Sequence, residues 1–114
     1  MVQEKSYKFA LRIVNLYKFL VGKKEFVLSK QVLRSGTSIG ANIKEAIGGQ
    51  SEKDFLSKFA IAYKEARETK YWIKPLIDRS FLEFKQTEFL LNDCDELCRI
   101  IAKIQITCKE KYNS

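Results

Sequence analysis

Carboxylates are the residues of this chain whose spacing is best suited to chemistry. Glu65 and Glu68 lie about one helical turn apart in an apolar-periodic segment, and Glu45 lies beside a second apolar row. Carboxylates gathered among apolar side chains can form an acid–base pair or hold two metal ions inside a helical bundle. The di-metal arrangement normally needs a Glu-x-x-His motif, and the chain has no histidine. An enzyme that uses these carboxylates is our least favoured hypothesis, and we predict no catalytic residue.

The three cysteines are the other candidates for metal or redox chemistry. Cys94 and Cys98 are four residues apart and can share a helical face, but two thiols make only half of a zinc site. Cys108 continues the same apolar spacing, which favours reduced thiols buried in a core. No glycine-rich phosphate loop follows a strand pattern. We predict no metal, no cofactor and no small-molecule substrate.

A polar stripe accompanies the apolar rows of two segments. Ser35, Ser38, Asn42 and Glu45 recur at helical spacing on the earlier segment. Partly buried carboxylates need hydrogen-bond donors, which an arginine, an amide and hydroxyls can supply. We therefore interpret the polar residues of both segments as a structural polar network, made of Arg34, Ser38, Asn42, Glu45, Glu65, Glu68 and Trp72.

The positive charge of the chain indicates a polyanionic partner. The net charge is +7, from 21 Lys and Arg against 14 Asp and Glu, and residues 81–114 hold none of the excess. A basic surface favours nucleic acid or an acidic protein, although it also serves simply to keep a protein soluble. The predicted phosphate contacts lie on one flank of the first helix and in the loop after it, at Lys5, Lys8, Arg12, Lys23 and Lys24.

Four segments with helical periodicity must position these residues. They cover about 3–22, 29–48, 51–79 and a last stretch that runs to about 111 after a connection near 80–83. Long helices with short links pack most simply as an antiparallel up-down-up-down four-helix bundle. The sequence predicts this all-α fold for a single domain, residues 1–114. No apolar run approaches the ~20 residues of a membrane span, so we expect a cytoplasmic protein.

Local signals refine the expected helix ends. Ser29 is a plausible N-cap of the second helix, and Ser51 with Asp54 resembles a capping box at the start of the third. Gly48 and its neighbour stop the second helix. Pro75 predicts a kink or weakened last turns in the third helix.

Gly36 and Gly40 lie inside a predicted helix, where each costs roughly 1 kcal/mol relative to alanine. Close approach by a neighbouring helix would offset that cost, and we favour this over a ligand loop. The natural complement is a group of small residues on the third helix, Ala60, Ala62 and Ala66.

The first helix carries a second apolar row beside the one expected in the core. A single bundle core does not bury both rows, and an exposed apolar stripe usually marks a protein–protein contact. A wide core face is the alternative. We predict that this row is the seam of a homo-oligomer, formed by Tyr7, Ala10, Val14, Tyr17 and Val21.

Two blocks of the chain resemble a known bacterial family. The first has the form Q-x-x-R-S-x-x-S-I-x-x-N-I-x-E over residues 31–45, and the second contains Asp54-Phe55, Ala60-Ile61-Ala62, Glu65 and residues 68–72. This pattern resembles the four-helix bundle proteins encoded within intervening sequences of 23S ribosomal RNA genes, some of which are labelled ribosomal proteins. The resemblance covers nearly the whole chain. Ala46-Ile47-Gly48 and Pro75 depart from the family's pattern.

The resemblance implies an antiparallel bundle that assembles as a ring-like homopentamer. It also points to relatives that are accessory proteins of diversity-generating retroelements, whose basic barrel is proposed to bind nucleic acid and a reverse transcriptase. No catalytic residue comes with the family. The favoured hypothesis is a non-enzymatic, homo-oligomeric, basic bundle that binds RNA or DNA. The alternative is a protein-interaction adaptor or scaffold with no nucleic-acid role.

Overall fold

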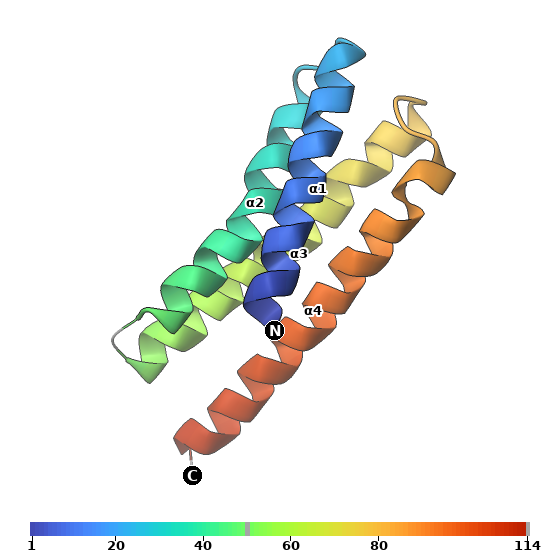
Figure 1. Ribbon diagram of the computed structural model, residues 1–114. Coiled ribbons are helices and arrows are strands. Elements are labelled where there is room, and N and C mark those ends of the chain that lie inside the picture. Colours follow the sequence, from blue (N-terminus) through green and yellow to red (C-terminus); the bar gives the residue numbers. More distant parts are fainter. Residues whose placement is uncertain (50, 114) are drawn as a thin grey trace.

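The computed structural model describes residues 1–49 and 51–113, and four helices account for nearly all of them. They are α1 (Val2–Gly22), α2 (Leu28–Ile47), α3 (Glu52–Asp78) and α4 (Phe84–Asn113). Consecutive helices run in opposite directions along the molecule (Figure 1). The predicted all-α four-helix bundle is confirmed, and each helix lies within a few residues of its expected bounds.

Each helix packs against two neighbours, so that the four enclose one core. The most extensive pairing joins α2 to α3, and the least extensive joins α1 to α4. Every helix contributes fully buried apolar side chains, among them Ile13, Ile39, Ile73 and Ile101. The molecule is elongated, about 50 × 21 × 20 Å, as long antiparallel helices with short links require.

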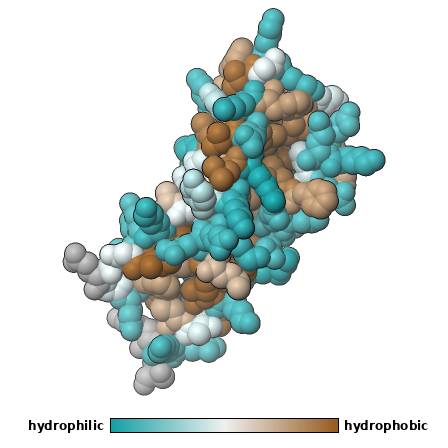
Figure 2. Space-filling view, in the orientation of Figure 1, coloured by the Kyte–Doolittle hydropathy of each residue, from teal (hydrophilic) through white to brown (hydrophobic). Residues whose placement is uncertain are grey.

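The last turns of α4 extend past the beginning of α1 (Figure 1). There the flank of α4 that elsewhere faces α1 is uncovered, and it forms an apolar hollow of about 450 Å³ with the start of α3. Phe55, Ile104 and Cys108 are among the residues that line it. Apolar side chains gather at this end of the molecule in Figure 2.

The predicted cap of α3 is confirmed, and that of α2 is wrong. The Ser51 hydroxyl accepts a hydrogen bond from the Asp54 backbone N–H at 3.0 Å. The helix α2 begins at Leu28, so Ser29 lies inside it and is buried. The Glu25 carboxylate accepts from the Ser29 N–H at 2.6 Å instead, because a carboxylate is favourable beside the free N–H groups of a helix start.

Pro75 does not end α3, which continues as helix to Asp78. A proline at this position removes the N–H that would bond to the carbonyl of Tyr71, four residues earlier, and its ring crowds the same carbonyl. Tyr71 is exposed, so water can satisfy that carbonyl. The last helical turn closes after the proline, with the Arg79 N–H donating to the Pro75 carbonyl at 2.9 Å. The loop then folds back, with the Phe81 N–H donating to the Leu76 carbonyl at 2.9 Å.

The two glycines of α2 permit a close helix approach, as predicted, but the partner is α1 rather than the alanines of α3. A Cβ on Gly36 would lie 2.6 Å from Cγ1 of Ile13. A Cβ on Gly40 would lie 3.3 Å from the hydroxyl and 3.4 Å from the carbonyl oxygen of Ser6. The absence of side chains at these two positions therefore sets the spacing between α1 and α2.

Candidate nucleic-acid interface

The three basic residues predicted on α1 are all paired with carboxylates. The Lys5 Nζ lies 2.9 Å from Oε1 of Glu96, and the Arg12 guanidinium pairs with Asp93. Lys8 pairs with Glu4 within α1. Two of these pairs join α1 to α4, the two neighbouring helices that contact each other least. Sequence reasoning missed these links, because the partners of Lys5 and Arg12 are more than 80 residues away along the chain.

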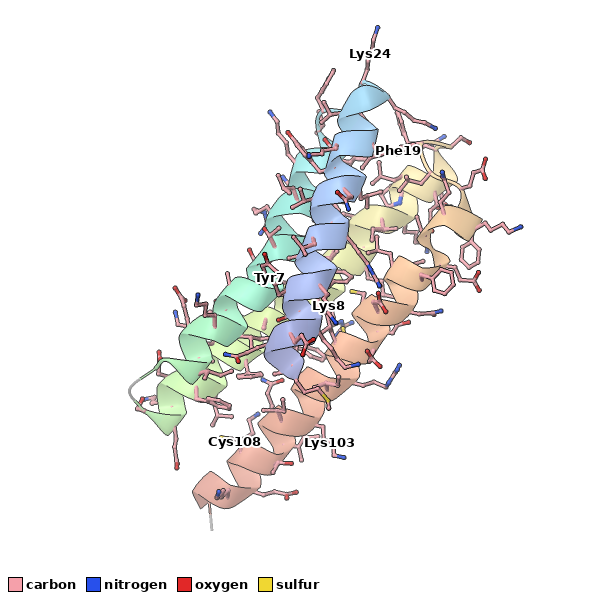
Figure 3. All side chains as sticks on the ribbon, in the orientation of Figure 1. Tyr7, Lys8, Phe19, Lys24, Lys103 and Cys108 are labelled. Carbon is pink, nitrogen blue, oxygen red and sulfur yellow. The ribbon has the colours of Figure 1, made fainter. Side chains whose placement is uncertain are left out.

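Lys23 and Lys24 lie away from those residues, in the loop between α1 and α2. The Lys23 ammonium sits over the Phe19 ring at 4.9 Å from its centroid, and its Nζ donates to the Phe81 carbonyl at 3.4 Å. Figure 3 places Lys24 at the tip of the bundle and Lys8 well down α1. The five predicted residues consequently form two separate regions.

A second basic surface, which the sequence interpretation missed, lies on the outer side of α3. Four cationic side chains are exposed there, and within the described part of the chain none has a carboxylate at salt-bridge distance. We call this set the α3 basic face; it comprises Lys53, Lys64, Arg67 and Lys74. Recurrence of basic residues at helical spacing in the sequence would have revealed it.

A groove of about 380 Å³ separates the α3 basic face from α4. From α3, Tyr63, Arg67, Lys70, Tyr71 and Lys74 line it; from α4, Asp95 and Cys98 do so. We call it the α3/α4 groove. The Lys70 Nζ lies 2.6 Å from Oδ1 of Asp95, and this hydrogen bond raises the pKa of Lys70. Lys70 thus stays protonated, and three cations face a single carboxylate in the groove.

Cys98 is half-buried in the α3/α4 groove, and the buried Cys94 lies one helical turn before it. The single S–H of Cys94 can donate either to the Ala66 carbonyl, at 3.1 Å, or to the Cys98 sulfur. The hydrogen bond with Cys98 and burial raise the pKa of Cys94, and the same hydrogen bond lowers the pKa of Cys98 to about 7. The pairing therefore favours the thiolate at Cys98 over that at Cys94. No three His, Cys, Asp or Glu side chains among the described residues are grouped to hold a metal ion.

The centre of the predicted polar network joins α2 to α3. Arg34 lies 3.1 Å from Oε2 of Glu65 and 3.2 Å from Oε1 of Glu68. Burial, with Glu68 nearby, raises the pKa of Glu65, while Arg34 opposes that rise. The hydrogen bond to Glu68 raises the pKa of Arg34. This arrangement holds the two carboxylates of α3 against one guanidinium of α2.

The other predicted members do not join that centre. The Ser38 hydroxyl donates to the Arg34 carbonyl and the Asn42 amide donates to the Ser38 carbonyl, both within α2. Glu45 pairs with Lys58 at 3.2 Å. The Trp72 indole N–H is buried and has no hydrogen-bond partner among the described residues. A buried link that sequence reasoning missed connects the hydroxyls of Ser35 and Thr69, 2.8 Å apart.

Removing the arginine at this centre should destabilise the fold in a pH-dependent way. We expect Arg34→Leu to lower the free energy of unfolding by about 1–2 kcal/mol near neutral pH, less than for a fully buried pair because Arg34 is half exposed. Glu65 already has a raised pKa, so its charged form costs stability above that pKa, and Arg34 reduces this cost. The difference between variant and wild type should shrink as pH falls through the pKa of Glu65.

Urea unfolding at about pH 7.5 and about pH 4 measures this difference. Lys30→Leu is the matched control, because Lys30 is an exposed cation of the same helix without an ion pair in the described structure. It should change stability little at either pH. An Arg34→Leu penalty that is the same at both pH values would contradict this account of Glu65.

The apolar row predicted as an oligomer seam is neither fully buried nor fully exposed. Tyr7 is 64% exposed, and the other four side chains are partly buried. Tyr7 and Ala10 line an open hollow of about 520 Å³ with Gly40 and Ala41 of α2. We call it the α1/α2 groove. Gly40 and Ala41 leave space for this groove, because they have little or no side chain.

The fold and these surfaces define a class, namely a basic antiparallel four-helix bundle with cations on the outer side of α3. The profile of the 23S rRNA-intervening sequence proteins matches residues 1–103, and the chain belongs to that family. Within the described residues, no helix is long and apolar enough to cross a membrane.

A solved structure agrees with this membership. A protein of unknown function from the S23 ribosomal protein family of Bacteroides thetaiotaomicron is 54% identical in sequence, and the two superpose with a TM-score of 0.90. The match covers 92% of this chain and 98% of that one. No curated protein matches the chain.

Proposed function

We propose that this protein is a non-enzymatic, homo-oligomeric basic bundle that binds RNA or DNA through phosphate contacts. The observation that carries the proposal is the α3 basic face, whose cations lack carboxylate partners in the described structure, whereas the predicted α1 contacts Lys5, Lys8 and Arg12 have them. Cations that are already paired must lose an attractive partner to bind a phosphate, whereas unpaired ones need only displace water and counterions. The net charge of +7 supports the same ligand class.

Assembly into a homo-oligomer would strengthen such binding. The α1/α2 groove and the hollow beside the end of α4 are both apolar and open, as surfaces that receive another chain are. The family resemblance favours five subunits. A ring repeats each α3 basic face around an axis, so a polyanion that spans several copies binds with avidity. The same apolar surfaces support the alternative, an adaptor that binds another protein.

Salt dependence tests the nucleic-acid proposal. We expect the protein to bind fluorescent RNA and DNA at ~50 mM salt and to lose affinity steeply toward ~200 mM, because phosphate contacts release counterions. The triple variant Lys53→Gln, Lys64→Gln, Lys74→Gln should flatten the plot of log affinity against log salt by a slope of roughly 2–3. Fluorescence anisotropy over a salt series measures both quantities.

A variant with the same loss of charge on α1 is the control: Lys5→Gln, Lys8→Gln, Arg12→Gln. Since those residues are paired, it should reduce the slope less than the α3 variant does. A larger reduction of the slope by the α1 variant than by the α3 variant would place the interface on α1. Absence of binding by the wild type at ~50 mM salt, where charge contacts are strong, would favour the protein-adaptor alternative.

A further inference from the structure

We propose that the α3/α4 groove binds single-stranded nucleic acid, with bases stacked on Tyr71 and Tyr63 and phosphates held by the neighbouring cations of α3. This inference rests on the proposed function and deepens it, because it names the form of nucleic acid and the site. Helical spacing places the lining residues of α3 in one row, with Tyr63 four residues before Arg67 and Tyr71 four residues after it.

Tyr71 offers a ring that is free to stack. Its side chain is 64% exposed, and its ring meets Trp72 edge-on, at 5.2 Å between centroids and 75° between planes. This edge contact holds the ring while a face stays open to the groove. An unpaired base can stack on such a face whatever its identity, whereas a base inside a duplex is already covered on both sides.

Arg67 extends this surface toward Tyr63. Its guanidinium lies over the Tyr63 ring, 6.0 Å from the centroid, at the outer limit of a cation–π contact. A guanidinium is planar, so it can stack on a ring or a base and still donate hydrogen bonds to phosphate. Aromatic rings that alternate with cations are the usual means of binding single strands without sequence preference.

The charge and length of the groove fit a short strand. Arg67, Lys70 and Lys74 face one carboxylate, Asp95, so the groove attracts an anionic backbone. The eleven residue steps from Tyr63 to Lys74 span about 16 Å of helix. At about 3.4 Å for each stacked nucleotide, that length accommodates four or five nucleotides.

Substitution of Tyr71 tests the stacking. The probes are fluorescein-labelled 12-nucleotide oligo(rU) and oligo(dT) and a mixed-sequence duplex of 12 base pairs, at ~50 mM salt. We expect one or both single strands to bind more tightly than the duplex. Tyr71→Leu should weaken single-strand binding at least about fivefold with little effect on the duplex. It should also leave the salt slope unchanged, because no phosphate contact is lost.

Phe84→Leu is the matched control, because Phe84 is an aromatic residue of similar exposure, 61%, that lies at the start of α4 outside the α3/α4 groove and the seam. It should bind single strands like the wild type. Lys74→Gln should weaken strands and duplex alike and reduce the salt slope by about 1. Equal effects of Tyr71→Leu and Phe84→Leu would overturn the assignment.

The cysteines supply a footprint that is independent of affinity. Cys98 lies in the α3/α4 groove, and Cys108 lies near the end of α4 in the apolar hollow (Figure 3). Saturating oligo(rU) or oligo(dT) should slow alkylation of Cys98 by N-ethylmaleimide severalfold and leave Cys108 unaffected. Peptide mass spectrometry after brief labelling measures the two rates.

The outcomes separate this inference from the function on which it rests. If the wild type binds no nucleic acid, the proposed function fails and the inference with it. Binding without protection of Cys98 keeps the function and overturns the groove as its site. Tighter binding of the duplex overturns the preference for single strands. Poly-glutamate that displaces oligo(rU) as well as unlabelled oligo(rU) does would assign the groove to acidic proteins instead.

Discussion

Gly36→Leu is expected to lose most of its cooperative thermal unfolding, and Gly36→Ala to melt well below the wild type. The first atom of any side chain at this position would lie 2.6 Å from Cγ1 and 2.8 Å from Cγ2 of Ile13. Ile13 is fully buried and branched, so it has little room to move. Overpacking costs about 1–3 kcal/mol for small insertions, more than the roughly 1 kcal/mol that alanine gains in helix propensity.

The other glycines form a graded series of controls. At Gly40 a Cβ would meet Ser6 at 3.3–3.4 Å, so Gly40→Ala should be milder than Gly36→Ala. At Gly22 a Cβ would have no neighbour within 4 Å, so Gly22→Ala should be neutral or slightly stabilising. Circular dichroism melts give the order. A Gly36→Ala variant that melts with or above Gly22→Ala would contradict the role of Gly36 in helix approach.

These glycines also illustrate what sequence can predict about this fold. A helix interior that tolerates two glycines indicates close packing from the sequence alone, because the cost in helix propensity needs an offset. The choice of neighbour depends on how α2 is rotated and shifted against α1 and α3. Small residues on α3 made it the apparent complement, yet Ile13 and Ser6 of α1 fill the space.

The helix bounds could be predicted from the sequence, because every segment has a strong apolar period and the links are short. The start of α2 could not be predicted in the same way. A serine before an apolar-periodic segment resembles an N-cap whether or not its hydroxyl accepts a hydrogen bond from the helix. Only the loop conformation lets Glu25 reach the Ser29 N–H. Helix ends depend on such long side chains, which leave no regular pattern in a sequence.

The ion pairs of the predicted α1 contacts could not be foreseen from the sequence. The basic row of α1 was conspicuous in the sequence, but its neutralisation by Asp93 and Glu96 depends on the register between α1 and α4. A charge count treats all cations alike. A cation in a salt bridge, however, contributes little to the positive potential that attracts a polyanion. The row of tyrosines and cations on α3 has a regular helical spacing and needed no tertiary knowledge to be noticed.

The polar network, too, was predicted only in part, because some of its hydrogen-bond partners depend on how the helices pack. Arg34, Glu65 and Glu68 were grouped correctly because a buried carboxylate needs a cation or another donor. Ser38 and Asn42 share the polar stripe but hydrogen-bond to their own helix, as hydroxyl and amide side chains often do. A polar stripe in the sequence therefore predicts which face of the helix the side chains lie on. It does not predict their hydrogen-bond partners.

Val14→Glu is expected to convert the proposed homo-oligomer largely to monomer. Val14 lies at the middle of the predicted seam and is partly buried within the subunit. A second subunit placed over the row would remove the remaining solvent from Val14. A carboxylate there would then be buried without a partner, once in every copy of the interface, and burying an unpaired charge is strongly unfavourable. Sedimentation velocity at micromolar concentrations measures the change.

Two further variants separate assembly from folding. Tyr7→Glu changes a residue that is 64% exposed in the subunit, so any loss of assembly cannot be attributed to a damaged core. Asn15→Glu adds the same charge at an exposed position next to Val14 in the chain, outside the seam, and should leave the oligomer intact. Equal helicity of all three variants by circular dichroism would show that the subunits fold. If the wild type itself sediments as a monomer, or if Val14→Glu and Tyr7→Glu assemble like Asn15→Glu, the row is not an oligomer seam and its partly buried side chains only widen the subunit's own core.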